Sequence, residues 1–243
     1  VLNAAAAPRV VVVGAGFGGA TVAKYLRMWG GNIDVTLLDA NATHAACILS
    51  NLVITGALPM SSITLGFDKL ATTHGVTVMQ GRAQAIDPPG NTLTVNTASG
   101  LKVLPYDHLV LSPGIDFSPA PGIWDPLRTP HAWQAGAQTT LLKNQLAAMR
   151  SYDTFVMTVP KAPYRCPPGP YERACQVASY FKAAKPKSKV LILDANPDVT
   201  SKGALFKKVW AEQYAGMVEY RGQHKAMSVD AKTNTVKFEV QDD

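Results

Sequence analysis

Blocks of apolar residues separated by polar turns predict an alternation of strands and helices along the 243-residue chain. The first block, RVVVV at residues 9–13, predicts a buried strand, and a glycine turn and a helical pattern follow it. NIDVTLLDA predicts a second strand that ends in Asp39. GVTVMQGRAQAID and NTLTVNTASG predict a strand and then part of a hairpin or meander, and YDHLVLSPG predicts another buried strand.

The second half of the chain repeats this order. Residues 115–150 predict a connector that is rich in Pro and Gly at first and then has helical spacing. TFVMTV, a helix after Pro170 and SKVLILDA predict a second β-α-β unit, and the tail predicts a hairpin that turns through Asn234. The sequence therefore predicts an α/β fold of two Rossmann-like units, with domains at residues 1–114 and 115–243.

Composition and charge exclude several functional classes. The formal net charge is +6, but the lysine clusters lack interleaved aromatic residues, so we interpret them as a solvated basic face and expect no nucleic-acid partner. No apolar run approaches about 18 residues, so we expect no transmembrane segment, and we expect no metal site. The start VLNAAAAPRV lacks Met, which fits a processed and exported protein, although trimming explains it equally well.

The turn GAGFGG indicates a dinucleotide site. Gly14, Gly16 and Gly19 form a G-x-G-x-x-G pattern between a predicted strand and a predicted helix. Gly14 allows the turn, Gly16 lets the backbone approach a pyrophosphate at the helix N-terminus, and Gly19 allows close packing of helix and sheet. Asp39 ends the next strand, where its carboxylate can accept hydrogen bonds from ribose hydroxyls.

A second turn favours FAD as the dinucleotide. Ser112-Pro113-Gly114 closes YDHLVLSPG and resembles the strand and turn that complete the FAD domain of two-dinucleotide flavoproteins, although an unrelated strand can also end in Pro-Gly. Further cofactor contacts are expected at Ala15 and Phe17 in the glycine turn, at Ala40 and Asn41 after Asp39, and at Ala83.

The turn of the second unit differs from the first. PKAPYRCPPGPYE contains a single glycine, and Pro167, Pro168 and Pro170 remove amide donors, so this turn cannot form a phosphate cradle. We therefore predict that the second unit has lost nicotinamide binding. The thiol of Cys166 occupies this turn, and a flavin beside a thiol indicates sulfur redox chemistry.

Several stretches together resemble the flavoprotein subunit of flavocytochrome c sulfide dehydrogenase, a relative of sulfide:quinone oxidoreductases and disulfide reductases. They are VVVGAGFGGATVAKYLR, CILSNLVITG, YDHLVLSPGIDF, HAWQAGAQT, TSKGALF and, most specific of all, RCPPGPYERA. The resemblance implies a fold of the glutathione-reductase type. It also implies FAD-dependent sulfide oxidation at a redox-active disulfide, transfer of electrons to haem on a separate c-type cytochrome subunit, and a periplasmic location.

The resemblance assigns roles to individual residues. Cys166 matches the first redox cysteine, and Glu172 matches an acidic residue near the flavin that could relay protons, although a carboxylate in a first helical turn needs no such role. Cys175 matches no redox cysteine and is expected to be a small core residue. Three cysteines cannot all pair within the chain.

Cys47 stands alone in a region that lies against the isoalloxazine ring in disulfide reductases. A thiolate there could attack the 8α-methyl carbon and give an 8α-S-cysteinyl FAD, the linkage that the resemblance implies, whereas a core cysteine is the simpler interpretation. Ser50 and Asn51 are expected near the ring. His44 is a candidate base for the thiol, with an exposed loop histidine as the alternative.

The resemblance ends early. The family's chains are longer and continue to a second redox cysteine and a C-terminal domain that this sequence does not contain, so it is either a piece of a longer polypeptide or a truncated homologue. Two other functions stay open: a sulfide:quinone oxidoreductase, and a flavin-binding module without turnover.

Overall fold

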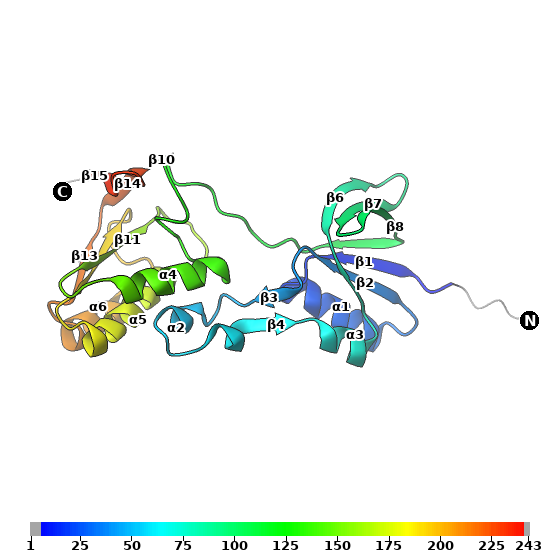
Figure 1. Cartoon of the computed structure of the whole chain (residues 1–243), viewed down its shortest axis with the longest axis horizontal. Helices are drawn as coiled ribbons and strands as arrows, with labels where there is room; N and C mark the ends of the chain where they lie inside the picture. The colour runs from blue at the N-terminus through cyan, green and yellow to red at the C-terminus, as the bar shows by residue number, and fades with distance from the viewer. Residues whose placement is uncertain (1–5, 241–243) are drawn as a thin grey trace, which may run out of the picture. The chain divides into compact units, whose positions relative to one another are not determined.

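The chain packs as two compact units in the computed structural model, which describes residues 6–240 (Figure 1). The first unit holds the residues up to Ala46 and Thr64–Phe117, and the second holds Cys47–Ile63 and the residues from Ser118 onward. Residues 1–5 of the start VLNAAAAPRV, on which the export expectation depends, lie outside the described residues.

A parallel four-stranded sheet of order β5-β2-β1-β9 forms the centre of the first unit, and Figure 1 labels its strands β1 and β2. Its strands are β1 (Arg9–Val13), β2 (Asp34–Asp39), β5 (Thr77–Gln80) and β9 (His108–Leu111). One face carries the helices α1 (Phe17–Trp29) and α3 (Asp68–His74). The other carries the antiparallel sheet β6 (Arg82–Asp87), β7 (Thr92–Thr97) and β8 (Gly100–Pro105), which confirms the predicted meander.

The valines of β1 explain why this strand is apolar throughout. Val10 and Val12 pack with Ala23 of α1, whereas Val11 packs on the opposite face with Leu93 and Val95 of the meander. Successive side chains of a strand point to opposite faces, so a strand covered on both faces has no polar position.

The chain leaves the first unit after β3 (Thr43–Ala45) and returns through its antiparallel partner β4 (Thr64–Gly66). Between them lie the helix α2 (Ser50–Ile54) and the 3₁₀ turn η1 (Met60–Ile63). The predicted domain 1–114 includes this segment, but it packs with the second unit because Ile54 is buried in that unit's core.

The second unit is built on the parallel sheet β11-β12-β13. Its elements are β11 (Thr154–Val159), β12 (Lys189–Asp194), β13 (Val218–Arg221), α4 (Ala137–Ala148), α5 (Gly169–Ala184) and α6 (Gly203–Gln213). A smaller sheet contains β10 (Gly122–Ile123), β14 (His224–Asp230) and β15 (Thr235–Val240), and the last two form the predicted hairpin. No helix among the described residues combines the length and apolarity needed to cross a membrane.

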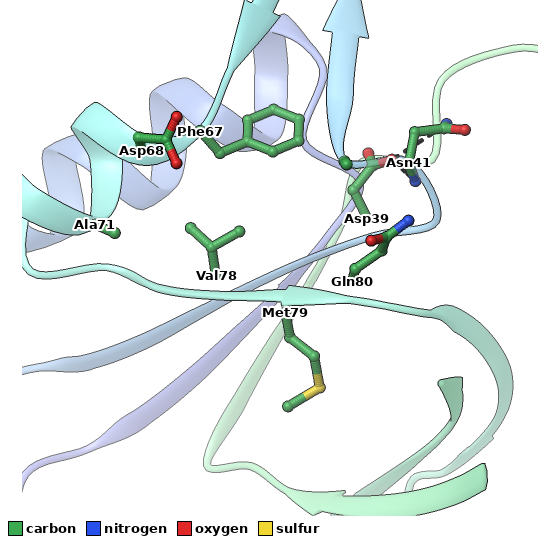
Figure 2. A pocket seen from close by; sticks show the side chains of 9 residues that line it. Asp39, Asn41, Phe67, Asp68, Ala71, Val78, Met79 and Gln80 are labelled. Atoms are coloured by element: carbon green, nitrogen blue, oxygen red, sulfur yellow. Dashed lines mark hydrogen bonds between the residues drawn. The ribbon is translucent and has the colours of Figure 1, made fainter. Parts of the chain in front are cut away.

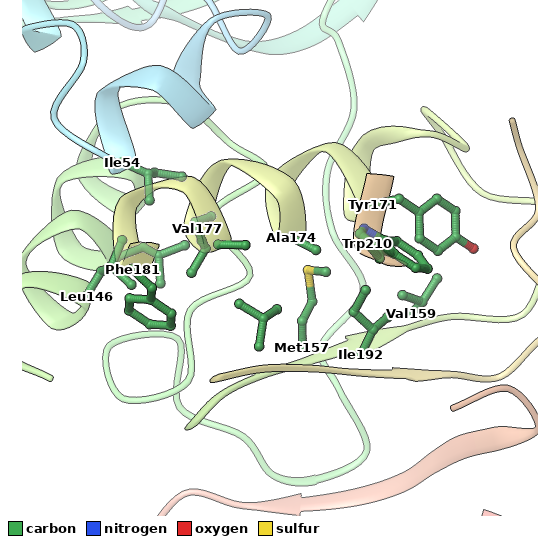
Figure 3. Packing of buried hydrophobic residues seen from close by; sticks show 14 of the residues in the cluster. Ile54, Leu146, Met157, Val159, Tyr171, Ala174, Val177, Phe181, Ile192 and Trp210 are labelled. Atoms are coloured by element: carbon green, nitrogen blue, oxygen red, sulfur yellow. The ribbon is translucent and has the colours of Figure 1, made fainter. Parts of the chain in front are cut away.

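One continuous core holds the second unit together (Figure 3). Met157 reaches from the sheet toward Ala174 of α5, while Ile192 lies beside Trp210 of α6 at the end of the cluster opposite Phe181. Full burial of one large apolar side chain contributes about 1.5–3 kcal/mol, so α5 is fixed firmly on the sheet. The predicted α/β fold with two Rossmann-like units is confirmed, and it places α5, with the turn before it, at the carboxyl end of β11.

Candidate functional site

The turn between β1 and α1 admits only glycine at two positions. Gly14 has φ +95°, and a Cβ added to it would lie 2.1 Å from the carbonyl oxygen of Ser112. A Cβ on Gly19 would lie 1.8 Å from the carbonyl oxygen of Gly14. Both contacts are with backbone, so a side chain at either position would displace the turn. The two predicted cofactor turns, at Gly14 and at Ser112, therefore lie against each other.

The N-terminus of α1 has features that favour the binding of an anion. Gly16 caps the helix, and among the residues described here the helix start has neither a side-chain cap nor an acidic residue in its first turn. The first amides of a helix have no partner within the helix, and the helix dipole favours negative charge there. Phe17 is largely exposed at this end. The arrangement suits a pyrophosphate.

Asp39 fastens this turn to the end of β2. Its Oδ2 accepts the backbone N–H of Ala15 at 2.7 Å, and its Oδ1 accepts the backbone and side-chain N–H groups of Asn41 at 2.8 and 3.3 Å. A carboxylate oxygen has two acceptor positions, so Oδ2 keeps one for a ribose hydroxyl.

A hollow of about 220 Å³ lies beside Asp39 (Figure 2). Figure 2 shows Asp39, Asn41 and Gln80 together at one end, while Val78 and Ala71 lie toward the other, where the carboxylate of Asp68 also stands. Gln80 donates through Nε2 to the carbonyl oxygen of Ala40 at 3.3 Å, which fixes that end of the hollow. The mixture of carboxylate, amide and apolar surface suits the adenosine part of a dinucleotide.

The remaining predicted cofactor residues of the first unit lie near this turn or in the sheet behind it. Ser112 donates its N–H to the carbonyl oxygen of Val13 at 2.7 Å and is followed by Pro113 and by Gly114 at φ +80°. Ala83 lies in β6 and packs into the core under the meander.

His44 provides the test of fit to a dinucleotide. It is half-buried in β3, with its ring edge-on to Phe17 at a centroid distance of 5.4 Å and its Cε1 3.6 Å from where a Cβ on Gly16 would lie. The alternative of an exposed loop histidine is therefore wrong, because strand pairing holds this residue against the glycine turn. Its buried Nε2 has no hydrogen-bond partner among the described residues, a costly state that a ligand at the turn would relieve.

The turn before α5 has none of these features. Pro168 caps the helix, Pro170 follows in its first turn, and Glu172 already places a carboxylate there. Cys166 is exposed and has φ +59°, a conformation that is uncommon for a residue with a side chain. Such backbone conformations cost on the order of 1–3 kcal/mol and cluster at functional sites.

Hydrogen bonds and close contacts hold Cys166 in this conformation. Gly169 donates its N–H to the carbonyl oxygen of Cys166 at 2.9 Å, and Tyr164 donates its hydroxyl to the carbonyl oxygen of Pro167 at 3.2 Å. A Cβ on Gly169 would lie 3.1 Å from the Cys166 Sγ and 3.4 Å from the ring of Trp133. The thiol and the indole thus flank Gly169, where a side chain would crowd both.

The carboxylate at the end of β12 is sealed inside the protein. Asp194 is fully buried, and its Oδ2 accepts the hydroxyls of Tyr171 at 2.6 Å and of Tyr220 at 3.1 Å. Its Oδ1 accepts the backbone and side-chain N–H groups of Asn196. Burial, together with the adjacent carboxylate, raises the pKa of both tyrosines, so they remain protonated donors. Asp194 is therefore not available to a ribose.

Cys47 belongs to the same compact unit as Cys166 and Glu172. It is exposed just before α2, and Ser50 donates its hydroxyl to the Cys47 carbonyl oxygen at 2.7 Å. Asn51 accepts the Nε–H of Arg173 at 2.8 Å. The side chains of Ser50 and Asn51, predicted near the flavin, are thus engaged within the chain, and their contact with a cofactor stays a prediction.

Cys175 differs from the other two thiols. It packs against the core of the second unit, and its Sγ accepts the indole N–H of Trp210 at 3.3 Å. Burial raises the pKa of this thiol. Its surroundings therefore favour an unreactive thiol, in line with the expected packing role.

Sequence reasoning missed two residues of this region. Arg173 is buried and stacks on Trp133, with its guanidinium carbon 3.5 Å from the ring centroid. A signal was present, because Arg173 shares a helical spacing of four with the buried Val177 and Phe181. No comparable signal marks Trp133, which lies in the connector.

Two family models match the chain. Residues 8–149 match "pyridine nucleotide-disulphide oxidoreductase". Residues 139–243 match "sulfide dehydrogenase [flavocytochrome c] flavoprotein chain, central". The second match confirms the predicted resemblance over the part of the chain that holds Cys166.

Curated relatives match shorter stretches. The chain is 53% identical over 45 residues to a sulfide dehydrogenase [flavocytochrome c] flavoprotein chain of Chlorobaculum thiosulfatiphilum, which is 18% of this chain and 94% of that sequence. It is 35% identical over 107 residues to the type II NADH:quinone oxidoreductase NdhA of Mycobacterium tuberculosis, which is 44% of this chain and 22% of that protein.

Solved structures share the fold over almost the whole chain. The sulfide:quinone oxidoreductase of Aquifex aeolicus matches 96% of this chain with a TM-score of 0.72 at 19% identity. The water-forming NADH oxidase of Lactobacillus brevis matches 96% with a TM-score of 0.71 at 18% identity. The matched regions cover 56% and 50% of those proteins, so this chain spans about half their length.

Proposed function

The chain belongs to the pyridine nucleotide-disulphide oxidoreductase family, and from that premise we propose that it is the FAD-carrying part of a sulfide-oxidising flavoprotein that passes electrons to a c-type cytochrome subunit. The observation that supports this best is the turn before α5, where an exposed Cys166 stands among prolines in place of a phosphate cradle. The match of residues 139–243 to the sulfide dehydrogenase flavoprotein model supports the substrate class.

FAD is the cofactor that the first unit suits. The glycine turn and the N-terminus of α1 would hold the pyrophosphate, Asp39 a ribose, and the hollow beside it the adenosine part. The bound flavin would supply the ability to take an electron pair and release it one electron at a time. Cys47 would tie the flavin to the chain through a thioether to its 8α carbon, and its exposure leaves the sulfur open to that bond.

Cys166 would be the residue that reacts with sulfide. Cys166 would react while it forms a disulfide with another cysteine: HS⁻ would attack its sulfur, the disulfide bond would break, and the other cysteine would leave as a thiolate with the electron pair. The sulfide sulfur, now the outer sulfur of a persulfide on Cys166, would be at the oxidation level of elemental sulfur and would give up its proton. Glu172, in the first turn of α5, would take the proton. The partner of Cys166 in the redox disulfide would come from outside the chain.

The electron pair would leave toward haem c on a separate subunit. A redox-active thiol and a c-type haem partner both suit an oxidising, exported compartment, so we propose the periplasm as the location. The basic surface, with a net charge of +6, would favour association with an acidic partner.

Anaerobic reduction of the native protein, isolated with any residues that flank this chain, tests the proposal. Sulfide should bleach the flavin rapidly and NADH should not, because the buried Asp194 and the proline-rich turn do not suit the binding of a nicotinamide dinucleotide. Reduced flavin should then reduce a c-type cytochrome faster than a soluble quinone.

The opposite acceptor preference would indicate a sulfide:quinone oxidoreductase. A flavin that neither reductant bleaches would indicate a binding module. Mass spectrometry of the denatured protein should show FAD on a Cys47 peptide, and fully released flavin would disprove the covalent bond.

A further inference from the structure

Arg173 is a buried cation without an anionic partner among its hydrogen-bond acceptors. Its guanidinium donates to three neutral oxygens: Asn51 Oδ1 through Nε at 2.8 Å, the His131 carbonyl at 2.8 Å and the Ala132 carbonyl at 2.6 Å. One face of the guanidinium lies 3.5 Å from the ring centroid of Trp133. Burial lowers the pKa of Arg173 to about 9.

Stability alone does not account for this residue. Removing a guanidinium from water is costly, and an apolar side chain of similar volume often does as well or better in a core. An apolar side chain cannot donate hydrogen bonds to acceptors on other segments. Arg173 donates hydrogen bonds to two segments, to α2 at Asn51 and to the connector at His131 and Ala132.

Each of the two segments that Arg173 binds lies close to a cysteine that is predicted to be reactive. On one side, Asn51 follows Ser50, whose hydroxyl and N–H both donate to the carbonyl oxygen of Cys47. On the other side, Trp133 lies against Gly169 together with the Sγ of Cys166. All of these residues belong to the second compact unit.

We propose that Arg173 is a positioning residue that holds the Cys47 segment and the Cys166 turn at a fixed spacing within the second unit. The inference depends on the proposed function only in treating these two cysteines as reactive. Loss of the guanidinium would free α2 from the connector and remove the support behind the ring of Trp133, so the two thiols would no longer keep one spacing.

Distances between two nitroxide labels on the full chain test this directly. One label is placed on Ile48→Cys, at an exposed position next to Cys47, and the other on Cys166. Cys47→Ser and Cys175→Ser in the same background leave no other thiol, and the measurement does not depend on flavin attachment. The reference protein should give one narrow distance distribution.

Four variants test whether the hydrogen bonds of the Arg173 guanidinium set the distance between the two labels. Asn51→Ala and Arg173→Met should each broaden the distribution by at least about twofold, because the tie between the two segments is lost. Asn51→Asp keeps an acceptor oxygen and should restore the narrow distribution. Val177→Ala is the control, since it lowers the melting temperature by weakening the same helix without touching the tie.

A distribution that stays narrow in Asn51→Ala and Arg173→Met would overturn the inference, as would equal broadening in Val177→Ala, which would make Arg173 merely a packing residue. A broad distribution in the reference protein would overturn it too. A narrow distribution that broadens when the Arg173–Asn51 hydrogen bond is lost would uphold the positioning role of Arg173. If sulfide failed to reduce the flavin of the same protein, the proposed function would be rejected while the positioning role would stand.

Discussion

The segments β1–α1–β2 and β11–α5–β12 have the same order and end in the same three residues, Asp-Ala-Asn, yet the carboxylates of the two aspartates have different partners. In both, the first carboxylate oxygen accepts the N–H groups of the asparagine two residues later. The second oxygen differs. That of Asp39 accepts an N–H from the glycine turn, whereas that of Asp194 accepts two buried tyrosine hydroxyls.

The helix starts differ in the same way. The start of α1 is open, with Gly16 as its cap, while the start of α5 has prolines and the carboxylate of Glu172. An anion would therefore be attracted to the first and repelled by the second. The comparison teaches that two units with the same order of elements can differ both at the turn before the helix and at the acidic residue that ends the second strand, and still keep the same fold.

The largest expected effect is at the turn before α5. Cys166→Ser should abolish sulfide-driven reduction of the flavin in the complete enzyme, because a hydroxyl cannot form the bond to sulfide sulfur. Cys175→Ser is the matched control in the same unit and should have a mild effect, since Cys175 packs against the core. Stopped-flow recording of flavin absorbance measures both, and the reverse ranking would assign the reactive thiol to Cys175 in α5 and contradict the role of Cys166.

A large effect is also expected at the first turn. Gly19→Ala places a Cβ 1.8 Å from the Gly14 carbonyl oxygen, so the turn must shift. We expect a loss of about 3 kcal/mol, or roughly 100-fold in FAD affinity. Fluorescence titration in a Cys47→Ser background, where no covalent bond can form, measures it.

Gly203→Ala provides the control for this glycine. Its Cβ would lie 3.4 Å from Val199, which is an ordinary contact, so FAD affinity should not change. An unchanged affinity in Gly19→Ala as well would mean that the first turn is not the phosphate site, and the contrast between the two turns would fail.

A smaller effect is expected at the sealed carboxylate. Tyr171→Phe removes the 2.6 Å hydrogen bond to the buried Asp194 and should lower the free energy of unfolding by about 1–3 kcal/mol without changing FAD affinity. Urea denaturation followed by tryptophan fluorescence measures this. If the variant kept full stability and gained oxidation of NADH, Asp194 would be an accessible ligand and not a core residue.

The smallest expected effect is a difference in alkylation rate between Cys166 and Cys175, which can be measured without any ligand. Burial raises the pKa of Cys175, so less of it is thiolate at pH 8, and iodoacetamide should modify Cys166 at least about 10-fold faster. Modification of Cys175 should continue to accelerate as the pH rises beyond the point where a free thiol levels off. Mass spectrometry of the two cysteine peptides gives the rates, and equal rates would contradict the burial of Cys175.

The sequence predicted the strands well because each is a run of mostly apolar residues. RVVVV and KVLILD are parallel strands covered on both faces, whereas TFVMTV is a parallel edge strand whose Val156 is exposed. The glycine turn was equally clear, because backbone crowding at Gly14 and Gly19 admits no other residue.

Features that depend on distant partners were not predictable. The segment Cys47–Ile63 joins the second unit because Ile54 and Asn51 contact residues far along the chain. The two Asp-Ala-Asn sequences look alike, and only the positions of Tyr171 and Tyr220 in space make Asp194 a core residue. No local pattern shows that His44 lies against the glycine turn.

The excursion of Cys47–Ile63 into the second unit also sets an order of events during synthesis. This segment leaves the ribosome before Leu146, Val177 and Phe181, which lie beside Ile54 in the core of the second unit, have been made (Figure 3). Domains generally fold from the N-terminus onward as they emerge, but here the first unit must fold around a loop whose own partners are still missing. Until translation passes α5, Ile54 has no core to enter, and Cys47 lies on a segment that nothing yet holds in place.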